Sequence, residues 1–279
     1  MICWRVSDAL SLGKYSTRRK FKCKACHRQY SVTSGTIFAS RKLAFMDVLA
    51  AIFLFVNGAK GKSAVQMSRE LDVQYKTAWV LCHKLREAMG TEIQTGEVLD
   101  GHVEIDGAYF GGHVRPENRK VDRKDRRRRE NRSDRRRVVV AMRERLGRTV
   151  PFVTKSEADG VDLAKMHVDR MATVSADEAS HWDDLHDGWF VERVNHSLTY
   201  SDHGKHTNWV ESYFSRLRRM VSGQHHHVSP QYLYQYANHA AWLEDNRRTP
   251  NGGLAGQLVA ASMDAPVSRQ WKGYWQRSV

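Results

Sequence analysis

The stretch His102-Val-Glu-Ile-Asp-Gly-Ala-Tyr-Phe-Gly-Gly112 alternates apolar and polar residues and ends in a glycine pair. This pattern predicts a strand at about Val103–Phe110, followed by a turn. The strand carries Asp106, and Glu104 points to the same face because side chains alternate along a strand. Glu104 fits either a helper acid beside Asp106 or a solvated surface acid.

Two further acids occupy comparable places in the sequence. Asp177 ends the short stretch Ala-Thr-Val-Ser-Ala-Asp, just before a polar run that starts a helix. Glu211 lies in the segment 207–219, where apolar residues recur with helical spacing. Two carboxylates at strand ends and one on a helix can hold Mg²⁺ or Mn²⁺ at a phosphodiester. Each acid alone is most simply a surface residue, so only the set of three predicts a metal site.

The surrounding pattern predicts an α/β fold, with a mixed sheet flanked by helices. Three strands follow one another, and strands then alternate with helices. The expected strands are 103–110, 137–143, 149–154, one ending at Asp177, and 190–194. The expected helices are 161–171, 178–185, the segment with Glu211, and 230–247.

The N-terminal part of the chain reads as helical from 41 to 90. One apolar helix is expected at 43–56, a short one after Ser63 as N-cap with Gln66 as its capping partner, and a third at 75–89. Residues 91–101 read as a linker. Two short helices with a tight connection resemble a helix-turn-helix, although any helical hairpin gives the same pattern. In that geometry the first turn of the second helix meets base edges, which selects Gln74, Tyr75, Lys76 and Thr77.

The charge balance predicts a polyanionic partner. The chain has 45 Lys and Arg against 31 Asp and Glu, and its pI is about 9.8. Nucleic acid is the first expectation, a membrane surface the second, and a merely soluble basic protein the alternative. The densest block, 123–137, holds ten basic and three acidic residues and predicts a loop or arm that contacts phosphate. Its candidate contacts are Arg126, Arg127, Arg128, Arg129, Arg135 and Arg136.

Other classes of protein are excluded by composition. The sequence has no apolar run of about 18 residues, which a transmembrane helix needs. Its first residues lack the apolar region of a signal peptide. We therefore expect a cytoplasmic, nucleoid-associated protein with reduced thiols and no membrane partner.

The cysteines predict at most a partial zinc site. Cys23 and Cys26 have the spacing of a zinc knuckle, but a structural zinc ion needs four ligands. Cys3 offers no second pair, and Cys82 lies in a helical pattern. Zn²⁺ is therefore possible only in an incomplete site.

Motifs along nearly the whole chain together resemble a DDE-type bacterial insertion-sequence transposase. The resemblance is to the group related to Merlin elements, which carries a zinc ribbon and a helix-turn-helix before an RNase H-like (integrase-type) catalytic domain. The motifs are YSVTSGTIF from Tyr30, GKSA from Gly61, YKTAW from Tyr75, VEIDGAYFGG from Val103, ADEA from Ala176, VNHS from Val194, TNWVESYFSRLRR from Thr207, GQHHHVS from Gly223, and SRQWKGYW from Ser268.

The resemblance implies a domain order and a set of site residues. It implies a partial zinc-ribbon-like segment at 1–40, a helix-turn-helix domain at 41–92, a catalytic domain at 100–250 with a basic insertion at 115–137, and a C-terminal tail at 251–279. Asp106 and Asp177 would be metal-binding aspartates. The third ligand is either Asn208 or Glu211, and Glu211 is favoured because a carboxylate neutralises Mg²⁺ better than an amide does. Arg218 and its neighbour Arg219 would meet DNA phosphate.

The implied activity is that of a Mg²⁺-dependent nuclease and strand transferase. It would free a 3′-hydroxyl at a transposon end and join it to target DNA, working as a homo-oligomer on paired ends. The family usually opens with a Cys-Pro-x-Cys pair, whereas this chain starts at Met1-Ile-Cys-Trp, so the ribbon is expected to be shortened. The alternatives are an inactive DNA-binding protein from a decaying transposon copy and an RNase H-like nuclease acting on RNA.

Overall fold

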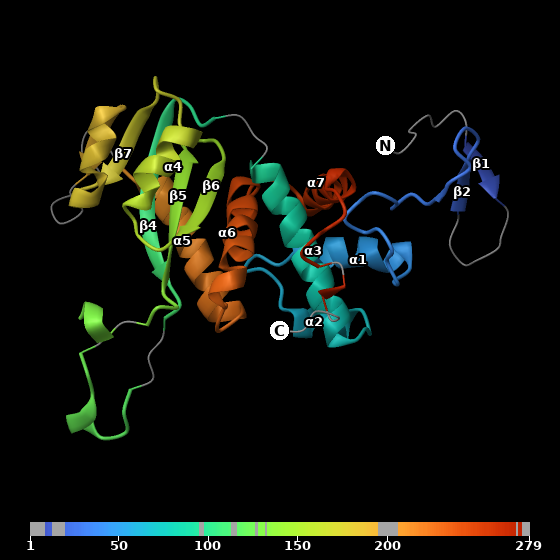
Figure 1. The fold of residues 1–279 in the computed structure, drawn as a ribbon, viewed down its shortest axis with the longest axis horizontal. Coiled ribbons are helices and arrows are strands. Elements are labelled where there is room, and N and C mark those ends of the chain that lie inside the picture. The colour runs from blue at the N-terminus through green and yellow to red at the C-terminus, as the bar shows by residue number, and fades with distance from the viewer. Residues whose placement is uncertain are drawn as a thin grey trace.

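The larger sheet of the protein has five strands in the order β6-β5-β4-β7-β8, as a computed structural model shows (Figure 1). β5 is antiparallel to both of its neighbours, whereas β4, β7 and β8 run parallel. This is the RNase H-like arrangement, so the expected fold class is confirmed. The strands are β4 (His102–Phe110), β5 (Arg137–Glu144), β6 (Thr149–Thr154), β7 (Thr173–Asp177) and β8 (Phe190–Val194). The structure describes residues 9–12, 20–94, 98–112, 116–125, 128–131, 133–194, 206–271 and 273–274.

Helices cover both faces of this sheet, which explains why its central strands are so apolar. In β5 the run Val138–Met142 is completely buried, as expected for a strand with both faces covered. On one face Arg143 Nη1 donates to the backbone oxygen of Trp209 in α5 (Asn208–Arg219) at 2.8 Å. The opposite face is covered by α4 (Asp159–His167), whose Gly160 lies against Val140. α6 (Pro230–Asp245) packs beside α5.

Two expected helices in this region differ from the structure. The one expected at 161–171 is α4, which begins earlier and ends at His167. It ends there because Val168 becomes extended and pairs with Leu99. The one expected at 178–185 is a 3₁₀ helix at Ser180–Asp187.

Three N-terminal helices form a group that packs against the helices that follow the larger sheet in the chain. They are α1 (Phe45–Val56), α2 (Ala64–Glu70) and α3 (Tyr75–Gln94). Ser63 Oγ accepts the Gln66 N–H at 3.1 Å, so the predicted N-cap is confirmed. α3 packs on α6 and is longer than expected, so the first residues of the predicted linker are helical.

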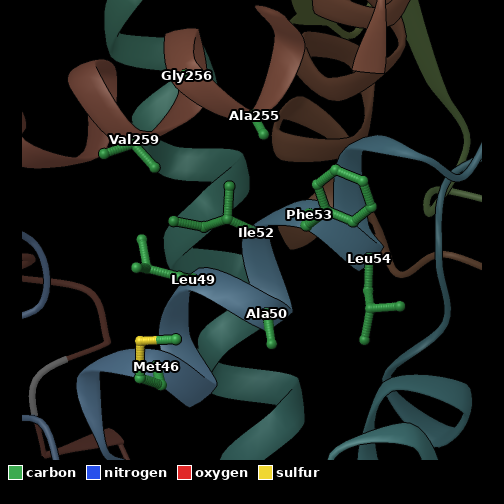
Figure 2. Close-up of a pocket in the computed structure, with 9 residues that line it drawn as sticks. All are labelled: Met46, Leu49, Ala50, Ile52, Phe53, Leu54, Ala255, Gly256 and Val259. Atoms are coloured by element: carbon green, nitrogen blue, oxygen red, sulfur yellow. The ribbon is translucent and has the colours of Figure 1, made fainter. Parts of the chain in front are cut away.

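A further helix lies where the sequence predicted only a tail. α7 (Asn251–Asp264) packs on α1 and α3 through Leu254 and Leu258. Its glycines weaken the intrinsic helical signal, and tertiary packing supplies what propensity lacks. Figure 2 shows the open apolar hollow that α1 and α7 leave between them, lined by side chains such as Met46 and Phe53.

The C-terminal segment after α7 ties α3 to α6. Trp271 is only 1% exposed, and its ring lies 5.0 Å from that of Trp79 and 4.5 Å from that of His83 in α3. Gln235 of α6 donates to Gln270 at 2.9 Å. The described residues of the motif that begins at Ser268 therefore form a packing element between two parts of the protein.

A small antiparallel sheet lies at the far end of the molecule from the larger sheet (Figure 1). Its strands are β1 (Ala9–Leu12), β2 (Lys20–Cys23) and β3 (Gln29–Tyr30). The rings of Phe21 and Tyr30 stack across it at 5.6 Å. No helix in the described part of the chain is long and apolar enough to cross a bilayer.

Replacing Trp271 with Ala should lower the free energy of unfolding by about 3–5 kcal/mol, as is usual for truncating a buried aromatic side chain. Urea denaturation followed by tryptophan fluorescence and circular dichroism measures this change. Val267→Ala is the matched control in the same segment, because Val267 is 37% exposed. Equal effects of the two substitutions would contradict the packing role of Trp271.

Candidate active site

The central strand β4 places Asp106 beside Asp177. The parallel ladder between β4 and β7 ends with Ile105 opposite Ala176. Asp106 and Asp177 are the next residues on the two strands, and neighbouring residues in register point to the same face. Beyond this point β4 continues to Phe110, paired there with β5. The two aspartates therefore lie where β7 stops and β4 runs on.

Glu104, two residues before Asp106, holds the start of α5 against the sheet. Its carboxylate is fully buried, and Oε2 accepts the backbone N–H groups of Trp209 at 2.8 Å and Val210 at 3.0 Å. These donors belong to the first turn of α5, where a carboxylate also interacts favourably with the helix dipole. Arg145 Nε donates to Oε1 at 3.1 Å. Of the two roles open to Glu104 from the sequence, solvated surface acid is therefore wrong.

This cap determines where Glu211 lies. Glu211 follows the capped turn directly and is half-buried, and its Oε1 accepts the Thr207 hydroxyl at 3.1 Å. Asn208 is exposed at the first position of α5, one turn before Glu211 and on the same side of the helix. Both candidates for the third ligand thus face the same region.

The acids form one electrostatic group around Asp106. The pKa of the Asp106 carboxyl is raised to about 7; burial is the largest cause, and the charges of Asp177, Glu157 and Glu211 contribute to the rise, in that order. The N–H of Gly107, which donates to Oδ1 at 2.7 Å, opposes the rise. The structure therefore brings Asp177 and Glu211 within electrostatic range of Asp106.

Glu157 is an acid of this group that the sequence analysis missed. It lies in the loop between β6 and α4, and burial is the largest cause of its raised pKa, which the charge of Asp177 also raises. His181 Nε2 lies 3.4 Å from its Oε2. The sequence around it, Lys-Ser-Glu-Ala-Asp, is an ordinary polar loop. The one available signal was the glycine directly after Asp106, because Gly107 lies against the Glu157 side chain.

The four acids are not a preformed, tightly closed metal site. Among the residues that the structure describes, no three His, Cys, Asp or Glu side chains meet closely enough to hold an ion as they stand. Asp177, Glu157 and Glu211 raise the pKa of Asp106 by charge repulsion, which acts over longer distances than the bonds from ligands to a shared ion. The arrangement is a negative region bordered by β4, β7 and α5.

The predicted zinc ligands lie at either end of a tight turn. Cys23 is buried at the end of β2, and Cys26 is exposed three residues later. The turn is closed by Cys23 N–H donating to Arg28 O and by His27 N–H donating to Cys23 O, both at 2.9 Å. Cys3 lies outside the described residues. Cys82 is buried in α3, where burial raises the pKa of its thiol to about 11.

The predicted base-reading residues lie at the start of α3. Gln74, Tyr75 and Lys76 are exposed, and Thr77 is half-buried. Gln74 precedes the helix, and its carbonyl accepts the N–H groups of Thr77 and Ala78. The first turn of α3, which is the second helix of the predicted helix-turn-helix, is therefore accessible to a partner.

The predicted phosphate contacts fall into two groups. The basic insertion leaves the sheet as a long excursion between β4 and β5, with short 3₁₀ turns at Lys120–Asp122 and Arg129–Asn131 (Figure 1). Arg126 and Arg127 lie outside the described residues, as does the side chain of Arg129. Arg128 and Arg135 are exposed, whereas Arg136 lies 3.8 Å over the Tyr109 ring, near the acids. The second group, Arg218 and Arg219, is exposed on the last turn of α5.

An RNase H-like sheet with acids gathered from two adjacent strands and a helix defines a DDE-type protein. A sequence profile described as "ISXO2-like transposase domain" matches residues 98–245, which is more than half of the chain. The chain belongs to the ISXO2-like transposase family. Asp106, Asp177 and Glu211 all lie inside the matched region.

One curated relative is an uncharacterised protein in the transposable element ISH50 of Halobacterium salinarum. It is 27% identical over 105 residues, which are 38% of this chain and 34% of that protein. The matched stretch thus spans about a third of the length of that relative.

Solved structures of the Mos1 transposase resemble the chain only weakly. A pre-cleavage Mos1 transpososome has a TM-score of 0.29 at 9% identity, over 77% of this chain and 79% of that one. A Mos1 paired-end complex with Mn has a TM-score of 0.24 at 11% identity, over 78% and 79%. The family assignment therefore rests on the profile match.

Replacing Glu104 with Ala should lower the free energy of unfolding by about 3–5 kcal/mol, because Arg145 and two helix N–H groups lose a buried partner. Chemical denaturation measures the change. Glu178→Ala is the control, since Glu178 is an exposed acid next to Asp177. A loss no larger than that of the control would show that the cap is dispensable.

Replacing Asp106 with Asn should stabilise the metal-free protein in a pH-dependent way. The pKa of Asp106 in the folded protein is about 7, against an ordinary value near 3.8. Between these two values the unfolded chain releases its proton and the folded protein retains it, so the free energy of unfolding falls as the pH rises towards 7. Above pH 7 the folded protein must hold a buried charge at Asp106. Thermal unfolding in a chelator should show a higher midpoint for the variant at pH 8 and a much smaller gain at pH 5. Asp184→Asn, at an exposed position, should show neither gain.

Proposed function

We propose that this protein is a DNA transposase that cuts the ends of its element and joins the freed 3′-hydroxyl to target DNA. The observation that carries the proposal is that the charges of Asp177 and Glu211 both act on Asp106, within a region matched by a transposase family. A concentrated set of carboxylates beside basic surfaces suits chemistry on a phosphodiester.

The donor set fits Mg²⁺ or Mn²⁺. Both ions prefer oxygen ligands, and Mg²⁺ is usually held by one or two carboxylates while it keeps several waters. Asp106, Asp177 and Glu211 would hold the metal, with Asn208 as an additional oxygen donor. When bound, paired ions would supply activation of the attacking oxygen and stabilisation of the leaving one. The raised pKa of Asp106 supports this fit, because a cation relieves the repulsion among the acids.

The protein's own residues would orient this site and the DNA. Glu104 holds the first turn of α5 and so keeps Glu211 facing β4. In our proposal the arginines of the excursion between β4 and β5, together with Arg218 and Arg219, contact phosphate. Phosphate contacts fix the position of the duplex without reading its sequence.

The N-terminal part would recognise the element's ends. We propose that α2 and α3 form a helix-turn-helix in which Gln74, Tyr75, Lys76 and Thr77 meet base edges, which their exposure supports. The turn from Cys23 to Cys26 would belong to one hairpin of a zinc ribbon. Pairing of two DNA ends would require a homo-oligomer.

Replacing Asp177 with Asn should reduce Mg²⁺-dependent cleavage of element-end DNA by at least ~100-fold, because a metal ligand is lost. The substrate is a duplex carrying the inverted repeats that flank the gene, and the product is resolved on a denaturing gel. Binding of the same duplex, measured by mobility shift, should be retained. Glu178→Gln should match the unmutated protein in both assays.

Three outcomes would contradict the proposal. Absence of cleavage by the unmutated protein with any divalent ion would favour an inactive DNA-binding protein. Faster cleavage of an RNA–DNA hybrid than of element-end DNA would favour a nuclease acting on RNA. Unchanged cleavage by the Asp177→Asn variant would remove Asp177 from the site.

A further inference from the structure

A glycine directly after Asp106 makes room for another carboxylate. A Cβ atom at Gly107 would lie 2.6 Å from Glu157 Cγ and 2.9 Å from its Oε1. The backbone does not require glycine there, because the φ angle of Gly107 is not positive. Space for the Glu157 side chain is therefore the reason that the structure gives for Gly107.

Glu157 approaches the acids from the face opposite to Glu211. Asp106 shares a face with Glu104, which binds α5. Gly107 points to the other face, as does its partner in register, Val140, which lies against α4. Glu157 comes just before α4. The end of β7 leaves this part of β4 open, so carboxylates from both faces can reach it.

The carboxylate of Glu157 is held in place by Tyr109 of β4 and by His181 of the 3₁₀ helix that follows β7. Tyr109 of β4 hydrogen-bonds to it. His181 lies four residues after Asp177, and its Nε2 is 3.4 Å from Glu157 Oε2. The Glu157 side chain is only 18% exposed. These contacts distinguish Glu157 from a freely solvated loop acid.

We propose that Glu157 is a fourth carboxylate of the active site, which binds the divalent metal or its water shell and is admitted by Gly107. This inference rests on the proposed function. Its physical reason is charge: two divalent ions bring four positive charges, and Asp106, Asp177 and Glu211 balance only three of them. A fourth carboxylate completes the balance. Glu157 thereby supplies the fourth negative charge, which Asp106, Asp177 and Glu211 do not provide.

Metal binding by the full-length protein without DNA tests the proposal directly. Isothermal titration calorimetry with Mn²⁺ should show about tenfold weaker binding for Glu157→Gln than for the unmutated protein. Glu178→Gln, a neutralised acid on the exposed side of Asp177, should bind Mn²⁺ as the unmutated protein does. Glu157→Gln keeps the size of the side chain, so loss of charge is the only intended change.

Gly107→Ala provides a second variant that leaves every carboxylate in the sequence. The added methyl group should displace Glu157 and weaken Mn²⁺ binding about as much as Glu157→Gln does. In a Glu157→Ala background the three atoms nearest to the added methyl group are removed, so the methyl group should have little further effect. This non-additivity is the signature of two residues acting through one contact, and a general loss of folding would not produce it.

Asp177→Asn separates failure of this inference from failure of the proposed function. If Asp177→Asn weakens Mn²⁺ binding while Glu157→Gln behaves like Glu178→Gln, the role of Glu157 is refuted and the proposed function stands. If Asp177→Asn also leaves Mn²⁺ binding unchanged, the metal site itself is refuted. Additive effects of Gly107→Ala and Glu157→Ala would likewise overturn the link between these two residues.

Discussion

The buried carboxylate of Glu104 is the contact on which the rest of the site depends. It joins the central strand to the first turn of α5 through two backbone N–H groups, and it has no access to solvent. Arg145 balances its charge from the end of β5. Asp106 follows on the same strand and Glu211 on the same helix, so one anchored point sets the distance between two acids that lie far apart in the sequence.

A second buried ionic group, centred on Glu244, also holds α5 in place, through Arg216 of that helix. Glu244 of α6 is 3% exposed and lies 3.2 Å from Arg143, 2.8 Å from Arg216 and 2.6 Å from Arg247. Burial raises the pKa of Glu244, but Arg216 and Arg143 together outweigh this effect and lower the pKa below its ordinary value. β5, α5 and α6 are thereby locked together. The acids that the helices and strands present repel one another, and this rigid frame keeps them close.

Much of the fold could be predicted because its strands have simple patterns. Alternation identified β4, and the apolar run of β5 matched a strand buried on both faces. Helix ends were harder, because Val168 leaves α4 to pair with Leu99, a distant residue. The three acids could be predicted because each lies within or at the end of a patterned element. Glu157 could not be found that way, since it lies in an unpatterned loop that only the folded chain brings to β4.

The arginine-rich excursion leaves from the strand that carries Asp106 and returns into the neighbouring strand of the same hairpin. Arg136, at its return, stacks on Tyr109 of that strand. If these arginines contact a DNA duplex, the hairpin would fix the distance between that contact and the scissile phosphodiester. Changes in the length of the arm near its base would then move the position of the cut along the DNA.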